Sequence, residues 1–230
     1  MKRFWTKAEA VEAEGGWTVA LDGRPIKTAG RSGLVVPSKR LAEAIAAEWD
    51  AVEDKVDPRA MPMTGLSNAA IDIVAKDAQA FADGLANYAT TELCCYRAEH
   101  PDNLCAMQDA AWDPLLEWAG KRYDVSFETT KGIMHVEQPA ATLERLQAAV
   151  RALDAFRLAG LSPLVTVGGS LVAALAVLDG EIEAEAAWDA VEVDARHQAE
   201  QWGADAEAEA RDEGRRGEYL AAARFLSLLD

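Results

Sequence analysis

The sequence has few of the side chains from which disulfide frameworks and metal centres are built. Its 230 residues include three histidines and only three cysteines, Cys94, Cys95 and Cys105. An odd number of cysteines, without C-x-x-C or paired Cys/His spacing, excludes a disulfide framework and gives no zinc signature. We interpret the three thiols as buried and reduced, as in a cytoplasmic protein.

Signatures of common enzymes are missing as well. There is no G-x-x-x-x-G-K-[ST] phosphate loop, no G-x-S-x-G nucleophile turn and no H-E-x-x-H zinc motif. Asp194 and His197 are spaced i, i+3, as in the metal sites of helical bundles, but no second helix carries the matching Glu-x-x-His pair. We therefore predict a protein that is not an enzyme and holds no cofactor or metal. A hydrolase or lyase that uses Asp194 and His197 is the catalytic alternative.

Positive charge is scarce and unevenly distributed. The chain has 23 Lys and Arg against 39 Asp and Glu, a net charge of −16. Residues 1–60 hold ten side chains of each sign, whereas residues 179–213 hold thirteen acids and two bases. A field of this sign repels phosphate groups, which argues against nucleic acid and anionic membranes as partners. The acidic stretch is either a solvated face or a surface for a basic partner, as in an acidic adaptor or inhibitor protein.

Long hydrophobic runs are also lacking. The longest, residues 161–178, is interrupted by serine, proline, threonine and glycine, so we predict a buried helix and no membrane insertion. The first seventeen residues contain acids and no apolar targeting core, which argues against a secretory or organellar presequence. Together these features indicate a cytoplasmic protein, and nothing in them suggests an obligate oligomer, so we expect a monomer.

What the sequence does contain is a short strand-rich beginning followed by alanine-rich helical segments. Residues 17–21 alternate in polarity, and Asp22-Gly23 then supplies a hairpin turn before a second strand over 24–28. Ser38 is expected to cap a helix. The apolar face of this helix repeats at helical spacing through Leu41, Ile45, Trp49 and Val52.

These patterns predict an α+β protein with two domains. The first, residues 1–63, is a small strand-rich domain with one helix, and the second, residues 64–230, is a larger all-α helical bundle. Residues 125–129 and 133–136 are expected to form a small extended excursion, and Pro114 to kink a helix or open a new one. Later helices are expected over 139–159, 163–178, 181–201 and 217–229, with breaks at Gly180, Gly203 and Gly217.

Six segments, in the same order over nearly the whole chain, resemble the assembly-chaperone family for the alpha subunit of F-type ATP synthase, known as the Atp-twelve chaperone family. They are LDGRPIKT (21–28), LVVPSKRLAEAIAAEWDA (34–51), MPMTGLSNAAID (61–72), the long segment from YATTEL to LLEWA (88–119), GSLVAALAVLDGEI (169–182) and DARHQAEQWG (194–203).

The resemblance implies a noncatalytic chaperone that binds the unassembled alpha subunit and prevents its aggregation until it pairs with the beta subunit. It also implies a small N-terminal α/β domain, a larger helical domain and no nucleotide or metal cofactor. Eukaryotic members work in the mitochondrial matrix. Because this chain starts almost directly at the family's first strand, we expect a bacterial, cytoplasmic member.

Two parts of the family pattern supply candidate partner-binding residues. Trp49 is the tryptophan of the family's E-W-D motif, although its place in an apolar helix face favours core packing over direct partner contact. Asp194, Gln198 and Trp202 match the late D/E-E-x-x-Q-x-x-x-W-G motif and share one helix face, which suits an interdomain contact as well as a partner-binding patch. Ala195 replaces the second acid of that motif. The central motif residues, which we expect to support interdomain structure, are Glu92, Tyr96, Arg97, Trp112 and Asp113.

Overall fold

The computed structural model describes residues 1–203 and 206–230 and divides them into two compact units. The first unit consists of residues 1–78, 154–160 and 224–230, and the second of residues 79–153 and 161–223. The sequence placed a single boundary after residue 63. The first unit instead continues to residue 78 and takes up two later segments, a pairing between distant parts of the chain that local composition does not encode.

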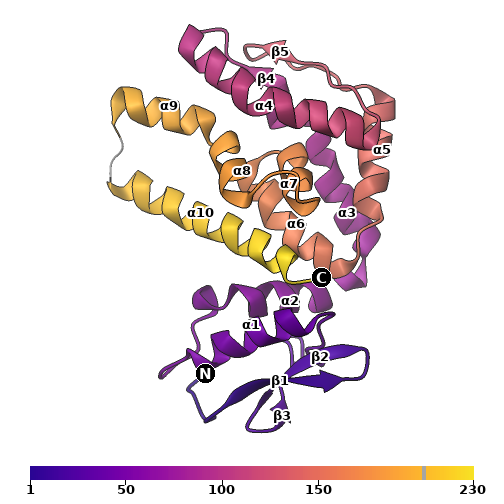
Figure 1. The fold of residues 1–230 in the computed structure, drawn as a ribbon, viewed down its shortest axis with the longest axis vertical. Coiled ribbons are helices and arrows are strands. Elements are labelled where there is room, and N and C mark those ends of the chain that lie inside the picture. Colours follow the sequence, from indigo (N-terminus) through magenta and orange to yellow (C-terminus); the bar gives the residue numbers. More distant parts are fainter. Residues whose placement is uncertain (204–205) are drawn as a thin grey trace. The chain divides into compact units, whose positions relative to one another are not determined.

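The first unit is a three-stranded antiparallel sheet, in the order β1-β2-β3, with helix α1 packed against β1 and β2 (Figure 1). Its helix α1 begins as expected at Ser38, whose hydroxyl accepts a hydrogen bond from the Leu41 amide at 3.0 Å. Asp22 and Gly23 both have positive φ, 48° and 80°, which suits the hairpin between β2 and β3. The elements are β1 (Ala8–Ala13), β2 (Gly16–Leu21), β3 (Arg24–Pro25), α1 (Lys39–Asp50) and α2 (Pro62–Asp72).

Helix α2 begins two residues earlier than the sequence suggested. The predicted helical domain starts at residue 64, but Pro62 is the first residue of the helix. Proline suits this position because its missing amide hydrogen is not needed in the first turn. The Glu48 carboxylate accepts hydrogen bonds from the Met63 and Thr64 amides at 2.6 and 2.8 Å, so the helix start is capped from α1. This first unit therefore contains a second α-helix.

The second unit is predominantly helical, as predicted. Helix α7 lies at its centre, with the residues from Leu171 to Ala176 all buried. The one described strand pair of this unit joins Tyr96–Arg97 (β4) in parallel to Thr130–Lys131 (β5). Its second strand falls between the predicted stretches 125–129 and 133–136, and neither stretch contains a strand. The helices with residues in this unit are α3 (Ala78–Ala86), α4 (Asp102–Tyr123), α5 (Ala140–Arg151), α6 (Ala155–Gly168), α7 (Leu171–Leu178), α8 (Ala184–Val191), α9 (Val193–Trp202) and α10 (Ala206–Ser227).

Four predicted helices have the wrong boundaries. The helix expected over 139–159 is divided, since Asp154 accepts hydrogen bonds from the Phe156 and Arg157 amides, both at 2.9 Å, and so starts α6. Pro163 then lies inside α6 instead of opening a helix. Helix α10 starts at residue 206, and Gly217 lies within it: the Ala-, Glu- and Arg-rich sequence before this glycine favours helix strongly enough to continue through it.

The fourth of these helices, predicted over residues 181–201, is instead two helices, α8 and α9, separated at Glu192. Glu192 is buried, and its carboxylate pairs with the Arg215 guanidinium of α10 at 2.7 Å. That guanidinium also lies 5.3 Å from the ring centre of Trp188 on α8. The break therefore places the buried Glu192 carboxylate against the Arg215 guanidinium of α10. No sequence signal within residues 181–201 predicts this break.

Candidate partner-binding site

Helix α9 carries three of the four candidate residues, and its first turn is attached to α4. The Asp194 carboxylate accepts a hydrogen bond from the Gln108 side chain at 2.6 Å. Gln108 is only 2% exposed, and its carbonyl oxygen accepts from the Ala98 amide at 2.7 Å. Asp194 therefore has a positioning role inside the second unit, in addition to any role at the surface. Gln108 was not singled out in the sequence, since its two partners are 10 and 86 residues away.

His197 belongs to the same attachment. It is buried, and its Nε2 atom lies 3.2 Å from the Asn103 side-chain nitrogen on α4. The imidazole and the Asp194 carboxylate thus have separate partners on α4, which gives both groups a structural explanation. Within residues 1–203 and 206–230, no three His, Cys, Asp or Glu side chains are grouped as a metal site.

The other end of α9 faces solvent. Gln198 is exposed, and Trp202, the last helical residue, is 82% exposed. Gly203 ends the helix with φ 76°, and its amide donates to the Ala199 carbonyl at 2.8 Å. An indole left in water offers a large apolar surface and a hydrogen-bond donor, the combination found at many protein interfaces. Asp194, Gln198 and Trp202, spaced i, i+4 and i+8, therefore lie on one helix face. This face is attached to α4 at Asp194 and exposed to solvent at Trp202.

The fourth candidate, Trp49, lies in the first unit and is 9% exposed. Its ring contacts that of Trp5 edge to face, with centroids 5.2 Å apart, and its carbonyl accepts from the Trp5 indole at 3.2 Å. The neighbouring Asp50 accepts from the Ala8 amide at 2.9 Å. Together with Glu48, which caps α2, each residue of the E-W-D motif thus holds a different segment of this unit in place. Partner contact through Trp49 stays a prediction.

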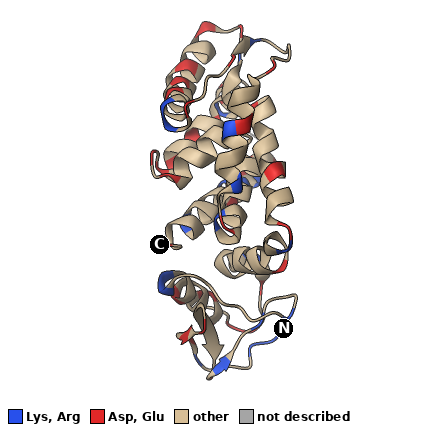
Figure 2. Cartoon of the chain, turned by 90° about the vertical axis from the view of Figure 1, so that its right-hand side faces the viewer, with Lys and Arg blue, Asp and Glu red and all other residues tan. Residues whose placement is uncertain are grey.

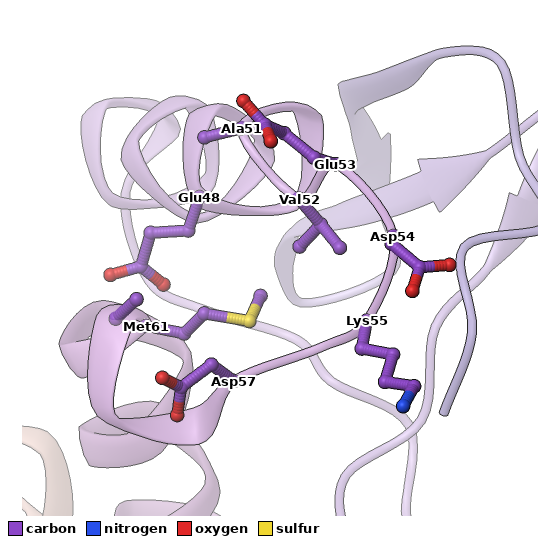
Figure 3. Close-up of a pocket in the computed structure, with 9 residues that line it drawn as sticks. Glu48, Ala51, Val52, Glu53, Asp54, Lys55, Asp57 and Met61 are labelled. Atoms are coloured by element: carbon purple, nitrogen blue, oxygen red, sulfur yellow. The ribbon is translucent and has the colours of Figure 1, made fainter.

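A cavity of about 370 Å³ lies next to this motif, bounded by the end of α1 and the connection to α2 (Figure 3). Burial raises the pKa of the Glu48 carboxyl above its usual range, and hydrogen bonds from Thr64 and Met63 oppose that rise. These bonds already engage Glu48 in capping α2, so the carboxylate that lines this cavity has a structural explanation. Its charged lining residues are Glu48, Glu53, Asp54, Lys55 and Asp57.

The central motif lies wholly inside the second unit, and the contacts described below join it to other residues of that unit. The interdomain role expected for it stays a prediction. Glu92 is completely buried and accepts hydrogen bonds from the Ser170 hydroxyl at 2.5 Å and from the Leu171 amide at 2.9 Å. Burial raises the pKa of the Glu92 carboxyl, while the donors from Ser170 and nearby amides lower it. This carboxyl group therefore holds the start of α7.

Arg97 and Trp112 anchor the neighbouring part of the same unit. The Arg97 guanidinium pairs with Asp109 at 3.0 Å and with Asp113 at 2.7 Å, and lies 5.2 Å from the ring centre of Trp112. The Trp112 indole donates to the Ala190 carbonyl of α8 at 2.7 Å. The motif thus fastens β4, α4 and α8 together. The fifth member, Tyr96, makes a 2.9 Å hydrogen bond to His135.

Comparison with known proteins identifies the family. The model of the ATP12 chaperone protein family matches residues 2–120. The chain belongs to this chaperone family. It is 41% identical to Atp12 from Paracoccus denitrificans, whose crystal structure has a TM-score of 0.95 to this fold, with 100% of this chain and 98% of that chain covered.

Two further relatives span bacteria and a eukaryote. The crystal structure of the Atu1473 protein from Agrobacterium tumefaciens is 36% identical, with a TM-score of 0.95 and coverage of 100% of this chain and 86% of that chain. Protein atp12, mitochondrial, from Schizosaccharomyces pombe is 26% identical over 238 residues, covering 98% of this chain and 82% of the relative. ATP12-family membership and the α+β fold predicted from the six motif segments are therefore confirmed.

Acidic residues occur on several helices of this ATP12-family protein, with basic residues between them (Figure 2). Several acids are already paired, as Glu185 is with Arg216 at 3.2 Å and Asp189 with Arg196 at 3.1 Å. Ion pairing leaves the net charge of −16 unchanged but reduces the number of unpaired carboxylates available to a partner. Among the described residues, no helix is both long and apolar enough to span a bilayer.

Proposed function

We propose that this protein is an assembly chaperone of F-type ATP synthase that binds the unassembled alpha subunit of the catalytic head. It prevents that subunit from aggregating until the beta subunit covers the same surface. Membership of the ATP12 chaperone family is the observation that carries the proposal. We further propose that the protein acts in the bacterial cytoplasm as a monomer, without catalysis and without a cofactor.

The physical basis is protection of an exposed interface. An unassembled subunit exposes apolar surface that its neighbour normally covers, and such surface drives aggregation. A protein that binds the folded, unassembled form stabilises it by mass action, without consuming a fuel molecule. Release follows when beta competes for the same surface. The exposed Trp202 and the attached Asp194 supply an apolar contact and a charge on one helix.

The acidic surface contributes orientation and encounter rate in this proposal. Basic groups on the client would be attracted to the negatively charged second unit, and this attraction weakens with added salt. Substitution Asp194→Asn tests the charge alone, since the remaining amide oxygen can still accept from Gln108. We expect a slower association rate for this variant and little change in its unfolding free energy.

Capture experiments test the function itself. The tagged full-length protein is mixed with separately expressed alpha subunit, beta subunit or preassembled alpha–beta complex, and retained protein is measured together with light scattering of the free alpha subunit. We expect capture and solubilisation of alpha alone. Failure to retain freshly prepared, monomeric alpha, under conditions where that alpha still assembles with beta, would contradict the proposal.

A further inference from the structure

A small apolar groove lies on the second unit between α4 and α8, at the first turn of α9. Its volume is about 290 Å³. We call it the α4/α8 groove, and its apolar lining residues are Ala110, Ala111, Pro114, Leu115, Ile182, Ala186 and Ala190. Leu115 and Ala190 are buried, whereas Ala110, Pro114 and Ala186 are exposed.

The lining explains why the space is open. Four of the nine residues around the groove are alanines, whose side chains end at Cβ and leave room between the two helices. The backbone beneath is fixed, because Trp112 of α4 donates to the Ala190 carbonyl of α8. Ligand pockets for cofactors and drug-sized molecules run from about 300 to 1,000 Å³. A groove at the lower end of this range suits one bulky apolar side chain.

The surroundings of the groove are negatively charged. Glu181 and Glu183 flank Ile182 in the sequence and are exposed, and neither carboxylate forms a salt bridge within residues 1–203 and 206–230. By contrast, the one cation on the lining, Arg196, is already paired with Asp189 at 3.1 Å and donates to its carbonyl at 2.6 Å. The unpaired charge beside the groove is thus acidic, and favours an occupant with positive charge next to its apolar group.

We propose that the α4/α8 groove binds a bulky apolar side chain of the client protein, from a segment in which Lys or Arg residues adjoin that side chain. The apolar group enters between α4 and α8, and the basic neighbours face Glu181 and Glu183. This inference rests on the proposed chaperone function, since it names the kind of client segment that is recognised. The groove is formed by α4, α8, Ile182 of the α7–α8 connection and Arg196 of α9, so it adds a contact surface next to the Asp194 helix turn.

Filling the groove tests the proposal. Ala186→Phe places an aromatic ring at an exposed groove position, and Ala148→Phe places the same ring at an exposed position of α5 outside the groove. Binding of unassembled alpha subunit is measured for the full-length wild type and for both variants by titration calorimetry, with thermal unfolding as the check on folding. We expect Ala186→Phe to weaken affinity at least about tenfold, equivalent to about 1.4 kcal/mol, and Ala148→Phe to leave it unchanged.

A second variant tests the charge requirement. The double substitution Glu181→Lys, Glu183→Lys is expected to weaken binding about tenfold at low salt and much less at high salt, because the lost attraction is screened. If Ala186→Phe bound the alpha subunit with the same affinity as the wild type, the groove proposal would be overturned. The proposed chaperone function would be unaffected by that result. Equal weakening by Ala148→Phe would also overturn the groove proposal. Unchanged binding by the double variant would contradict the claim that Lys or Arg residues adjoin the bound apolar side chain. If the wild type did not bind the alpha subunit at all, the proposed function itself would be contradicted.

Discussion

Replacement of Glu92 by alanine is expected to destabilise the second unit severely. Glu92 is fully buried, and its two oxygens accept hydrogen bonds from three backbone amides and one hydroxyl. The amides of Leu171 and Val172 belong to the first turn of α7, where no carbonyl of the helix can accept from them. Alanine would leave these donors without a partner inside the core.

The magnitude follows from the number of donors left unpaired. A buried donor without a partner costs about 1–3 kcal/mol, and the Cys94 amide adds a third to the two of α7. Water entering the vacated space recovers part of this loss. We expect Glu92→Ala to lower the unfolding free energy by about 3–6 kcal/mol, a large part of the typical total of about 5–15 kcal/mol.

Urea unfolding followed by circular dichroism measures this loss. Glu92→Gln is the informative partner variant, since its amide oxygen can still accept from α7 while its NH₂ group can donate to the Ser170 hydroxyl. We expect it to cost much less than alanine. Glu144→Ala, at an exposed position of α5, serves as the matched control and should change stability by less than about 0.5 kcal/mol. A loss below about 1 kcal/mol for Glu92→Ala would refute the capping argument.

Three further outcomes are expected. Burial raises the pKa of Glu92 in the folded state above the usual 4.5. The stability of the wild type should therefore fall relative to that of Glu92→Gln as pH rises from about 4.5 through the raised value. An opposite change in the difference between their unfolding free energies, measured by urea titration, would contradict this. Trp202→Ala should weaken binding of alpha at least about tenfold in calorimetry but change unfolding by under about 0.5 kcal/mol, since the side chain is 82% exposed; unchanged binding would exclude this contact. Ser38→Ala removes the α1 cap and the hydrogen bond from the Ser38 hydroxyl to the Leu228 carbonyl, and should lower the unfolding free energy in urea by about 1–2 kcal/mol. Ser227→Ala, at an exposed position, should change it by almost nothing, and equal losses for the two variants would contradict the capping role of Ser38.

The two tryptophans among the candidate residues show where sequence reasoning stopped. Trp49 and Trp202 both stand in family motifs beside acidic or polar residues, and both are candidate partner-binding residues on that ground. In the structure Trp49 packs against Trp5, while Trp202 lies in solvent at the end of α9. Exposure depends on which other segment covers a side chain. A helix pattern alone therefore could not separate the two.

The sequence by itself determined the features that depend on neighbouring residues. The Asp22-Gly23 turn, the Ser38 cap and the apolar face of α1 all arise from contacts within a few positions, and each was predicted correctly. The order of the six motif segments was sufficient to place the chain in its family. These signals persist in the sequence because local backbone geometry restricts which residue types can occupy a turn, a cap or a helix face.

Only the tertiary structure decided the roles of the polar residues and the breaks between later helices. Glu92 meets Ser170 across 78 positions of the chain, Gln108 meets Asp194 across 86, and Glu192 divides α8 from α9 by pairing with Arg215. A carboxylate on an alanine-rich helix looks the same in sequence whether it is solvated or buried. Its role is set by which distant donor lies within hydrogen-bonding distance, because a buried acid is stable only where such donors meet it.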